Sequence, residues 1–171
     1  MGTSVWGKAY ILFLALAAGF VWISSRALPD VVASHFGGSG LANGYMSHEG
    51  YVAFMLALLV GLAVFVVLLP NWLIAVPGAR INLPNRDYWL APERRAATVA
   101  TLRGFMLRIG TLLTAILVYA HWLVVEANAL TPPRLDNTWF LAGLAVFVLA
   151  TLASVAGLIV RFARVPSKRS P

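Results

Sequence analysis

Four long apolar stretches constrain the fold of this chain more than any other feature of its sequence. A helix needs about 20 apolar residues to cross the roughly 30 Å hydrocarbon core of a bilayer. We expect Pro70 to end the second stretch, because proline cannot continue the helical hydrogen-bond ladder. The sequence therefore predicts an all-α protein, an integral membrane four-helix bundle that forms a single domain over residues 1–171. The four stretches are 6–25, 50–69, 105–125 and 139–160.

Composition supports the membrane class and excludes others. Sixty per cent of the 171 residues are hydrophobic and 11% are charged, whereas a soluble domain carries about 25% charged residues. The chain has no cysteine, which excludes disulfides, thiolate metal ligands and cysteine nucleophiles. The net charge of +7 does not indicate nucleic-acid binding, because base-reading and base-stacking motifs are absent. The partner that the composition indicates is the lipid bilayer.

The basic residues are unevenly distributed between the connections. Of the 13 Lys and Arg residues, only Arg26 and Arg134 fall in the connections 26–49 and 126–138. The others lie in the connection 70–104, near the termini or just inside the third stretch, and basic residues accumulate on the cytoplasmic side of membrane proteins. We therefore expect both termini and 70–104 to be cytoplasmic, and 26–49 and 126–138 to be outer loops. The expected location is a bacterial plasma (inner) membrane, crossed several times.

The outer loop 26–49 contains residues that neither turns nor membrane anchoring require. Its glycines and its Asn-Gly pair are typical of turns. His35, Phe36 and Tyr45 have no such explanation. Together with Asn43, they are the residues that we expect to bind a peptide, a toxin or a protein partner.

The three histidines raise a second hypothesis for the outer side. His35, His48 and His121 all lie toward that side, and Glu49 lies at the same depth. Imidazole and carboxylate ligands suit zinc or copper, although the spacing matches no standard metal motif. The alternatives are histidines that hydrogen-bond to backbone and water, or a histidine that senses pH. We expect no cofactor unless these groups hold zinc or copper, and we name no catalytic residue.

The cytoplasmic connection carries aromatic and basic residues in the run 81–95, INLPNRDYWLAPERR. Pro92 suits the first position of a helix, which we expect to continue into the third stretch. Arg94 and Arg95 can contact lipid phosphates or pair with Asp87. The residues expected to contact lipid headgroups or a cytoplasmic partner are Arg86, Tyr88, Trp89, Arg94 and Arg95.

Two sequence signatures are shared with a known group of proteins. They are the run 81–95 and, in the outer loop, Leu28-Pro29, His35-Phe36-Gly37, Gly40 and Asn43-Gly44-Tyr45-Met46-Ser47. Together they resemble a bacterial membrane-domain family of unassigned function, which also occurs in immunity proteins against a sporulation-delaying peptide toxin. The resemblance implies a four-helix inner-membrane protein whose outer loop is the shared feature, and it supplies no reaction.

These observations favour a non-enzymatic membrane protein whose outer loop binds a peptide, toxin or protein partner, in an immunity-like or sensor-like role. No single segment carries paired carboxylates or a nucleophile–base motif. The first alternative is an accessory subunit of a larger membrane complex, or an oligomer, formed through small-residue faces that let helices pack closely. The second is an outer-face metal-binding protein or metalloenzyme that uses His35, His48 and His121.

Overall fold

The computed structural model describes residues 5–76 and 79–165 and confirms the four-helix prediction. Four helices are long and apolar enough to cross a membrane. The first is α1 (Val5–Ser24), which the turn η1 (Ser25–Ala27) extends, and the second combines α2 (His48–Leu62), the π-helical η2 (Ala63–Leu68) and α3 (Leu69–Leu73). The third and fourth are α5 (Pro92–Asn128) and α6 (Asn137–Ala163).

The connections between these helices also contain regular structure. The expected outer loop 26–49 forms an antiparallel hairpin of β1 (Val31–Phe36) and β2 (Ala42–Ser47). The short helix α4 (Arg86–Trp89) lies in the connection before α5. The fold is therefore helical with one small sheet, which we did not expect.

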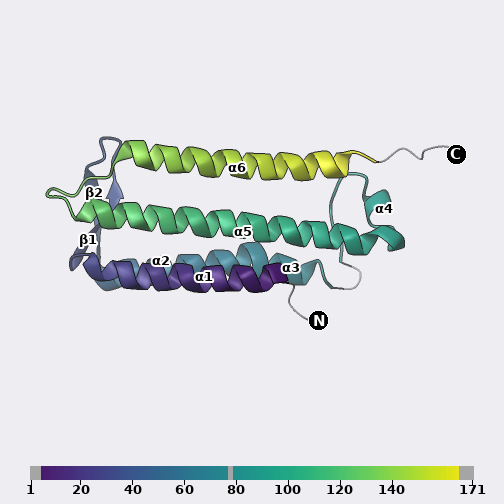
Figure 1. Cartoon of the computed structure of the whole chain (residues 1–171), viewed down its shortest axis with the longest axis horizontal. Helices are drawn as coiled ribbons and strands as arrows, with labels where there is room; N and C mark the ends of the chain where they lie inside the picture. Colours follow the sequence, from purple (N-terminus) through teal and green to yellow (C-terminus); the bar gives the residue numbers. More distant parts are fainter. Residues whose placement is uncertain (1–4, 77–78, 166–171) are drawn as a thin grey trace.

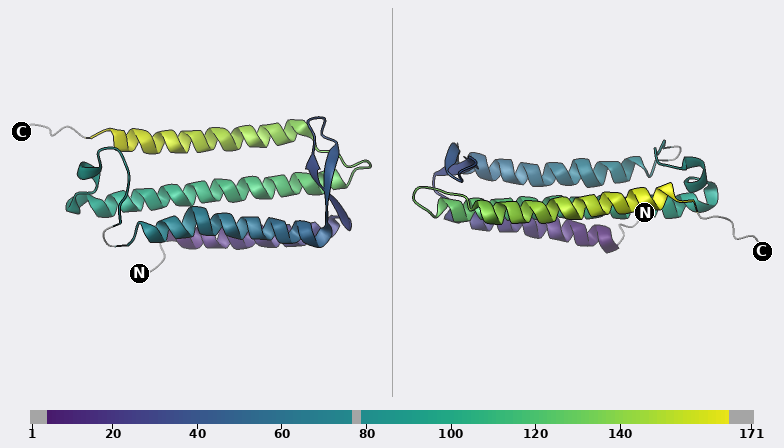
Figure 2. Two further views of the ribbon diagram at one scale, coloured as in Figure 1. Left: turned by 180° about the vertical axis from the view of Figure 1, so that it is seen from behind. Right: turned by 90° about the horizontal axis from the view of Figure 1, so that it is seen from above.

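The helices lie side by side with α5 in the centre. Figure 1 shows α1 and α2 along one side of α5 and α6 along the other side, and Figure 2 shows the same order from behind. Both figures place the hairpin across one end of the helices, here called the hairpin end, and α4 at the far end. Because α6 packs mainly on α5, it is the least buried of the four spans.

The largest core lies at the hairpin end, where α1, α2 and β1 meet. Partly buried side chains of α5 pack against it, so the core joins the hairpin to three helices. Close packing of this kind is the main attraction between helices in a membrane, since lipid tails are as apolar as the side chains. The buried members of this core are Val21, Leu28, Val32, Tyr51, Val52, Met55 and Leu59.

Two glycines allow the central helix to approach its neighbours closely. A Cβ atom on Gly110 would collide with Val67. A Cβ atom on Gly143 would collide with the ring of Tyr119, whose hydroxyl donates to the carbonyl of Trp139 at 2.6 Å. Small residues at such contacts are typical of membrane helix interfaces.

The expectation that Pro70 ends the second helix is wrong. The helix continues through this proline to Leu73, and the segment before it, η2, is π-helical. There the N–H of Leu69 donates to the carbonyl of Val64, five residues earlier. Wider turns of this type and proline are both common causes of irregular helix geometry, and here they occur together within one continuous span.

The helix α5 begins at Pro92, as the sequence predicts, and runs for 37 residues. At 1.5 Å per residue it is about 55 Å long, which exceeds the roughly 30 Å hydrocarbon core. The helix is therefore longer than a single crossing requires, and its first turns, at the far end, carry Arg94 and Arg95.

Replacement of Gly143 by alanine should weaken the contact between α5 and α6. The added methyl group would overlap the Tyr119 ring, and overpacking of this kind costs about 1–3 kcal/mol. Thermal unfolding of the purified protein in detergent micelles should show a clear fall in melting temperature. Gly157→Ala on the same helix is the matched control, because a Cβ atom there meets open space. Equal melting temperatures for the two variants would contradict the packing.

Candidate functional site

The hairpin contains the residues that the sequence suggested for binding. Val31 and Val32 in β1 are β-branched, which suits a strand. The chain then reverses, with the N–H of Gly37 donating to the carbonyl of Leu41 at 2.9 Å. Gly40 adopts a φ of +81°, a conformation that favours glycine. The turn glycines were recognisable in the sequence, whereas the pairing of the two flanking runs was not expected.

The outer edge of β1 is closed by a side chain of α5. The amide of Asn128 accepts the N–H of Ala33 at 2.9 Å and donates to the carbonyl of the same residue at 3.0 Å. Its Nδ2 also donates to the carbonyl of Val124 at 2.8 Å. Asn128 thus pairs with Ala33 as a neighbouring strand would, and satisfies two main-chain groups that a sheet edge leaves unpaired. The sequence analysis did not single out this asparagine, whose only signal is a polar side chain at the end of a long apolar stretch.

The tip of the hairpin is held by the connection between α5 and α6. The N–H of Leu135 donates to the carbonyl of Gly40 at 2.8 Å. The Nδ2 of Asn137 donates to the carbonyl of Gly38, also at 2.8 Å. As Figure 1 shows, the hairpin consequently extends from the ends of α1 and α2 to the start of α6. The hairpin is therefore held by hydrogen bonds at its β1 edge and at its tip.

The four candidate binding residues do not share one face of the hairpin. Tyr45 is 55% exposed and Asn43 is also exposed, and both alternate with Gly44 along β2. A Cβ atom on Gly44 would meet the His35 side chain, so the exposed His35 lies on the opposite face from Tyr45. Phe36 is half-buried and faces a pocket. The structure therefore brings Asn43 and Tyr45 together and separates them from His35.

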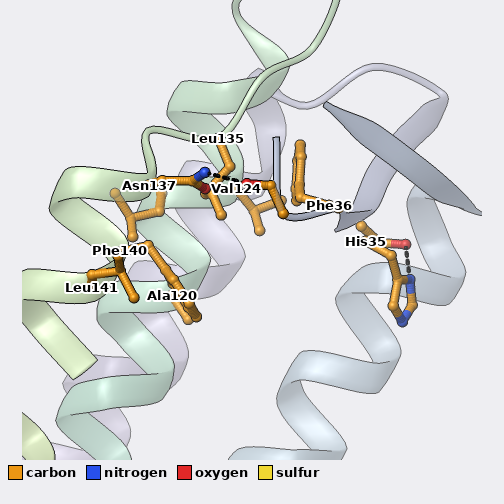
Figure 3. A pocket seen from close by; sticks show the side chains of 12 residues that line it. His35, Phe36, Ala120, Val124, Leu135, Asn137, Phe140 and Leu141 are labelled. Carbon is orange, nitrogen blue, oxygen red and sulfur yellow. Dashed lines mark hydrogen bonds between the residues drawn. The ribbon is translucent and has the colours of Figure 1, made fainter. Parts of the chain in front are cut away.

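A pocket of about 490 Å³ lies beneath the hairpin, between α5 and α6 (Figure 3). Its lining is mainly apolar and includes Phe36, Val124 and Phe140, while Asn137 supplies a polar group. In Figure 3 the ring of His35 points away from Phe140. The sequence did not predict this pocket, because nothing in it indicated that β1 would face the start of α6.

The structure does not assemble the metal site expected from the sequence. Among residues 5–76 and 79–165, no group of three or more His, Asp or Glu side chains could hold a metal ion. His35 is exposed on β1, His48 and Glu49 begin α2, and His121 is fully buried in α5. Glu49 lies in the first turn of α2, where a carboxylate interacts favourably with the positive end of the helix dipole. This interaction explains its position without a metal.

His121 joins three helices through a buried polar network. Its Nδ1 lies 2.9 Å from Oη of Tyr51 in α2, and its Nε2 lies 2.8 Å from Oγ of Ser24 in α1. The Ser24 hydroxyl donates to the carbonyl of Phe20 at 2.6 Å, so it accepts from Nε2, and Tyr51 donates to Nδ1. Both ring nitrogens are therefore satisfied, and the network stabilises the arrangement of α1, α2 and α5.

The direction of these hydrogen bonds also bears on catalysis. Ser24 and His121 have the separation of a nucleophile and its general base. A general base must accept the proton of the nucleophile, yet here the imidazole donates to the serine, whose own proton goes to Phe20. In this arrangement the pair connects α1 to α5.

At the far end, the run 81–95 caps the last helix. The Nδ2 of Asn85 donates to the carbonyls of Phe162 and Ala163, each at 3.0 Å. The Nε1 of Trp89 donates to the Phe162 carbonyl at 2.9 Å. The last carbonyls of a helix have no partner within it, so these side chains satisfy the end of α6.

Some residues expected to meet lipid or a partner are used inside the molecule. The Nε of Arg94 donates to the carbonyl of Tyr88 at 2.7 Å, and its guanidinium lies 4.1 Å from the centre of that ring. Arg94 forms an ion pair with Glu93 at 2.7 Å and not with Asp87, the partner that the sequence suggests. Contact with headgroups or a partner stays a prediction for all five residues, of which Arg86 is exposed and Tyr88, Trp89, Arg94 and Arg95 are half-buried.

Residues 10–72 match a family described as a domain of unknown function (DUF1648). The matched region contains most of α1, the hairpin and nearly all of the second span, and it is less than half of the chain. No curated protein and no solved structure matches the chain. The four spans and this match define the class: the chain is a multi-pass membrane protein of unknown function. Asn128 and the α6 wall of the pocket lie outside the matched region.

Replacement of Asn128 by alanine should loosen β1. The change leaves the N–H and carbonyl of Ala33 without partners, which costs about 1–3 kcal/mol. Hydrogen–deuterium exchange at the Ala33 amide should become about tenfold faster or more. Asn43→Ala is the control, because its exposed side chain forms no hydrogen bond within the described residues. Unchanged exchange in the Asn128 variant would count against this pairing.

Replacement of Tyr51 by phenylalanine should destabilise the helices. It removes the hydroxyl that donates to the buried Nδ1 of His121, and an unsatisfied buried acceptor costs about 1–3 kcal/mol. The midpoint of chemical unfolding in mixed micelles should fall accordingly. Tyr45→Phe, which removes an exposed hydroxyl from the hairpin, should leave the midpoint unchanged. A similar effect of both variants would refute the proposed role of the network.

Proposed function

We propose that this membrane protein is non-enzymatic and binds a peptide or protein partner at its hairpin. The observation that carries the proposal is that the hairpin is held at its β1 edge and tip while one face stays open. Val31 is 63% exposed and Tyr45 is 55% exposed on that face, beside the exposed Asn43. A backbone already held in place loses little conformational freedom on binding, and Tyr and Asn side chains are typical of recognition surfaces.

The charge distribution supports an approach from outside the cell. The first turns of α5 and the end of α6 carry basic residues at the far end, whereas the hairpin end carries few. The positive-inside rule therefore favours a cytoplasmic far end and an outward hairpin. The resemblance of the hairpin sequence to a family that occurs in toxin-immunity proteins supports an immunity-like or sensor-like role.

Selection from a random peptide library tests this proposal. The purified chain in phospholipid nanodiscs would be panned against phage that display random 12-residue peptides, with empty nanodiscs as the subtraction step. We expect enriched peptides whose affinity falls about tenfold in Tyr45→Ala, because a large aromatic contact is lost.

Trp72→Ala is the matched control for this selection. Trp72 is an aromatic residue that is 64% exposed, but it belongs to α3 near the far end. It should leave the affinity of the selected peptides unchanged. Enrichment no greater than on empty nanodiscs, or equal losses in the two variants, would overturn the proposal.

A second candidate function is an accessory subunit of a larger membrane complex. The observation that favours it is the position of α6, which packs mainly on α5 and leaves most of its surface uncovered by protein. Native gel electrophoresis after mild detergent extraction separates the two candidates. A particle that contains other proteins in fixed ratio supports the subunit, whereas an isolated 18.4 kDa chain supports an independent binding protein.

A further inference from the structure

The two-stranded sheet has one edge that the protein closes and one that it leaves open. On the β1 edge, Asn128 pairs with the main chain of Ala33. On the β2 edge, no side chain or further segment hydrogen-bonds to the main chain of Tyr45 within the described part of the chain. An unpaired strand edge is a template for another extended chain.

The register shows which main-chain groups are open. Antiparallel partners alternate between pairs that exchange hydrogen bonds and pairs whose N–H and carbonyl groups point away from each other. Ala33 directs both of its groups to Asn128, so its pair with Tyr45 is of the second kind. The N–H and carbonyl of Tyr45 therefore point outward from the β2 edge.

Closer to the tip, the same edge already pairs with an extended segment of this chain. The N–H of Ala42 donates to the carbonyl of Pro133 at 3.4 Å, and Leu41 forms an antiparallel bridge with Arg134. Because this N–H bonds to a segment outside the hairpin, it points away from β1 as well. The edge of β2 is thus geometrically suited to strand pairing. Leu41 and Ala42 already pair there with the segment 133–134, whereas Tyr45 does not.

We propose that the main chain of β2 at Tyr45 docks one extended peptide segment of the partner, which adds to the hairpin as a third strand. This inference rests on the proposed function and specifies the form in which the partner is bound. The partner's N–H and carbonyl groups pair with those of Tyr45, and its side chains contact the Tyr45 ring. Strand addition of this kind derives its affinity from main-chain hydrogen bonds and its selectivity from alternate side chains.

Amide exchange in the protein alone provides a test that needs no ligand. The N–H of Tyr45 should exchange rapidly, because it points outward without a partner. The N–H of Met46 should be protected, because its pair with Val32 is of the hydrogen-bonded kind. A protected Tyr45 amide in the free protein would overturn the inference, whatever peptides the library yields.

N-methylation of the most enriched library peptide tests the binding mode. N-methyl groups on every second residue should each weaken binding about tenfold or more, and those on the intervening residues should have little effect, because strand groups alternate in direction. Binding should also protect the Tyr45 amide. Peptides that bind without this two-residue period overturn strand addition and leave the proposed function intact. A library without any hairpin-dependent binder overturns both.

The variant Tyr45→Pro examines the same edge from the protein side. Proline removes the outward N–H and is tolerated at edge positions that donate nothing to the ladder. Binding should weaken beyond the loss in Tyr45→Ala, which keeps the N–H. Slow exchange at Met46 in the proline variant verifies that the hairpin is intact. If it is intact and binds like Tyr45→Ala, the outward N–H has no role and the inference is wrong.

Discussion

The pairing of one asparagine amide with one strand residue holds the hairpin end together. Asn128 belongs to the central helix, so its two hydrogen bonds to Ala33 place the hairpin relative to α5. Ala33 is fully buried, so leaving its N–H and carbonyl unpaired would cost free energy. Asn128 avoids this cost by hydrogen-bonding to both groups. The hydrogen bonds of Gly38 with Asn137 and of Gly40 with Leu135 then hold the tip of the hairpin over the pocket. The open edge of β2 depends on this placement.

His121, which lies beneath the hairpin, differs in its contacts from His35 in β1. Its ring stacks on Tyr51 with ring centres 5.7 Å apart, and its two nitrogens connect α1 and α2 to α5. A satisfied polar network can specify one arrangement of packed helices, and the hairpin follows directly from the ends of α1 and α2. His35, by contrast, is exposed and bonded only to its neighbour Ser34 among the described residues. The two histidines therefore serve separate parts of the molecule.

Much of the helical fold could be predicted from the sequence because its signals are local. Apolar runs identify the spans, and Pro92 marks the start of α5. The features that the sequence did not predict are contacts between residues that lie far apart in the chain. His121 meets partners 97 and 70 residues away, and Asn128 meets a strand 95 residues away. Pro70 misled for a different reason: proline is locally a helix-ending signal, yet here the helix continues through it after a π-helical segment. Asn43 and Tyr45 could be singled out as candidates from the sequence, but their separation from His35 is visible only in the register of the strands.

The outward position of the hairpin is the central claim, and cysteine labelling measures it directly. The chain has no cysteine, so Ser39→Cys at the exposed tip and Ala96→Cys in the exposed first turns of α5 each supply one reactive site. In intact cells, a membrane-impermeant maleimide should label the Ser39→Cys variant at once. It should label the Ala96→Cys variant only after permeabilisation. The reverse pattern would place the hairpin in the cytoplasm and contradict recognition of a partner from outside.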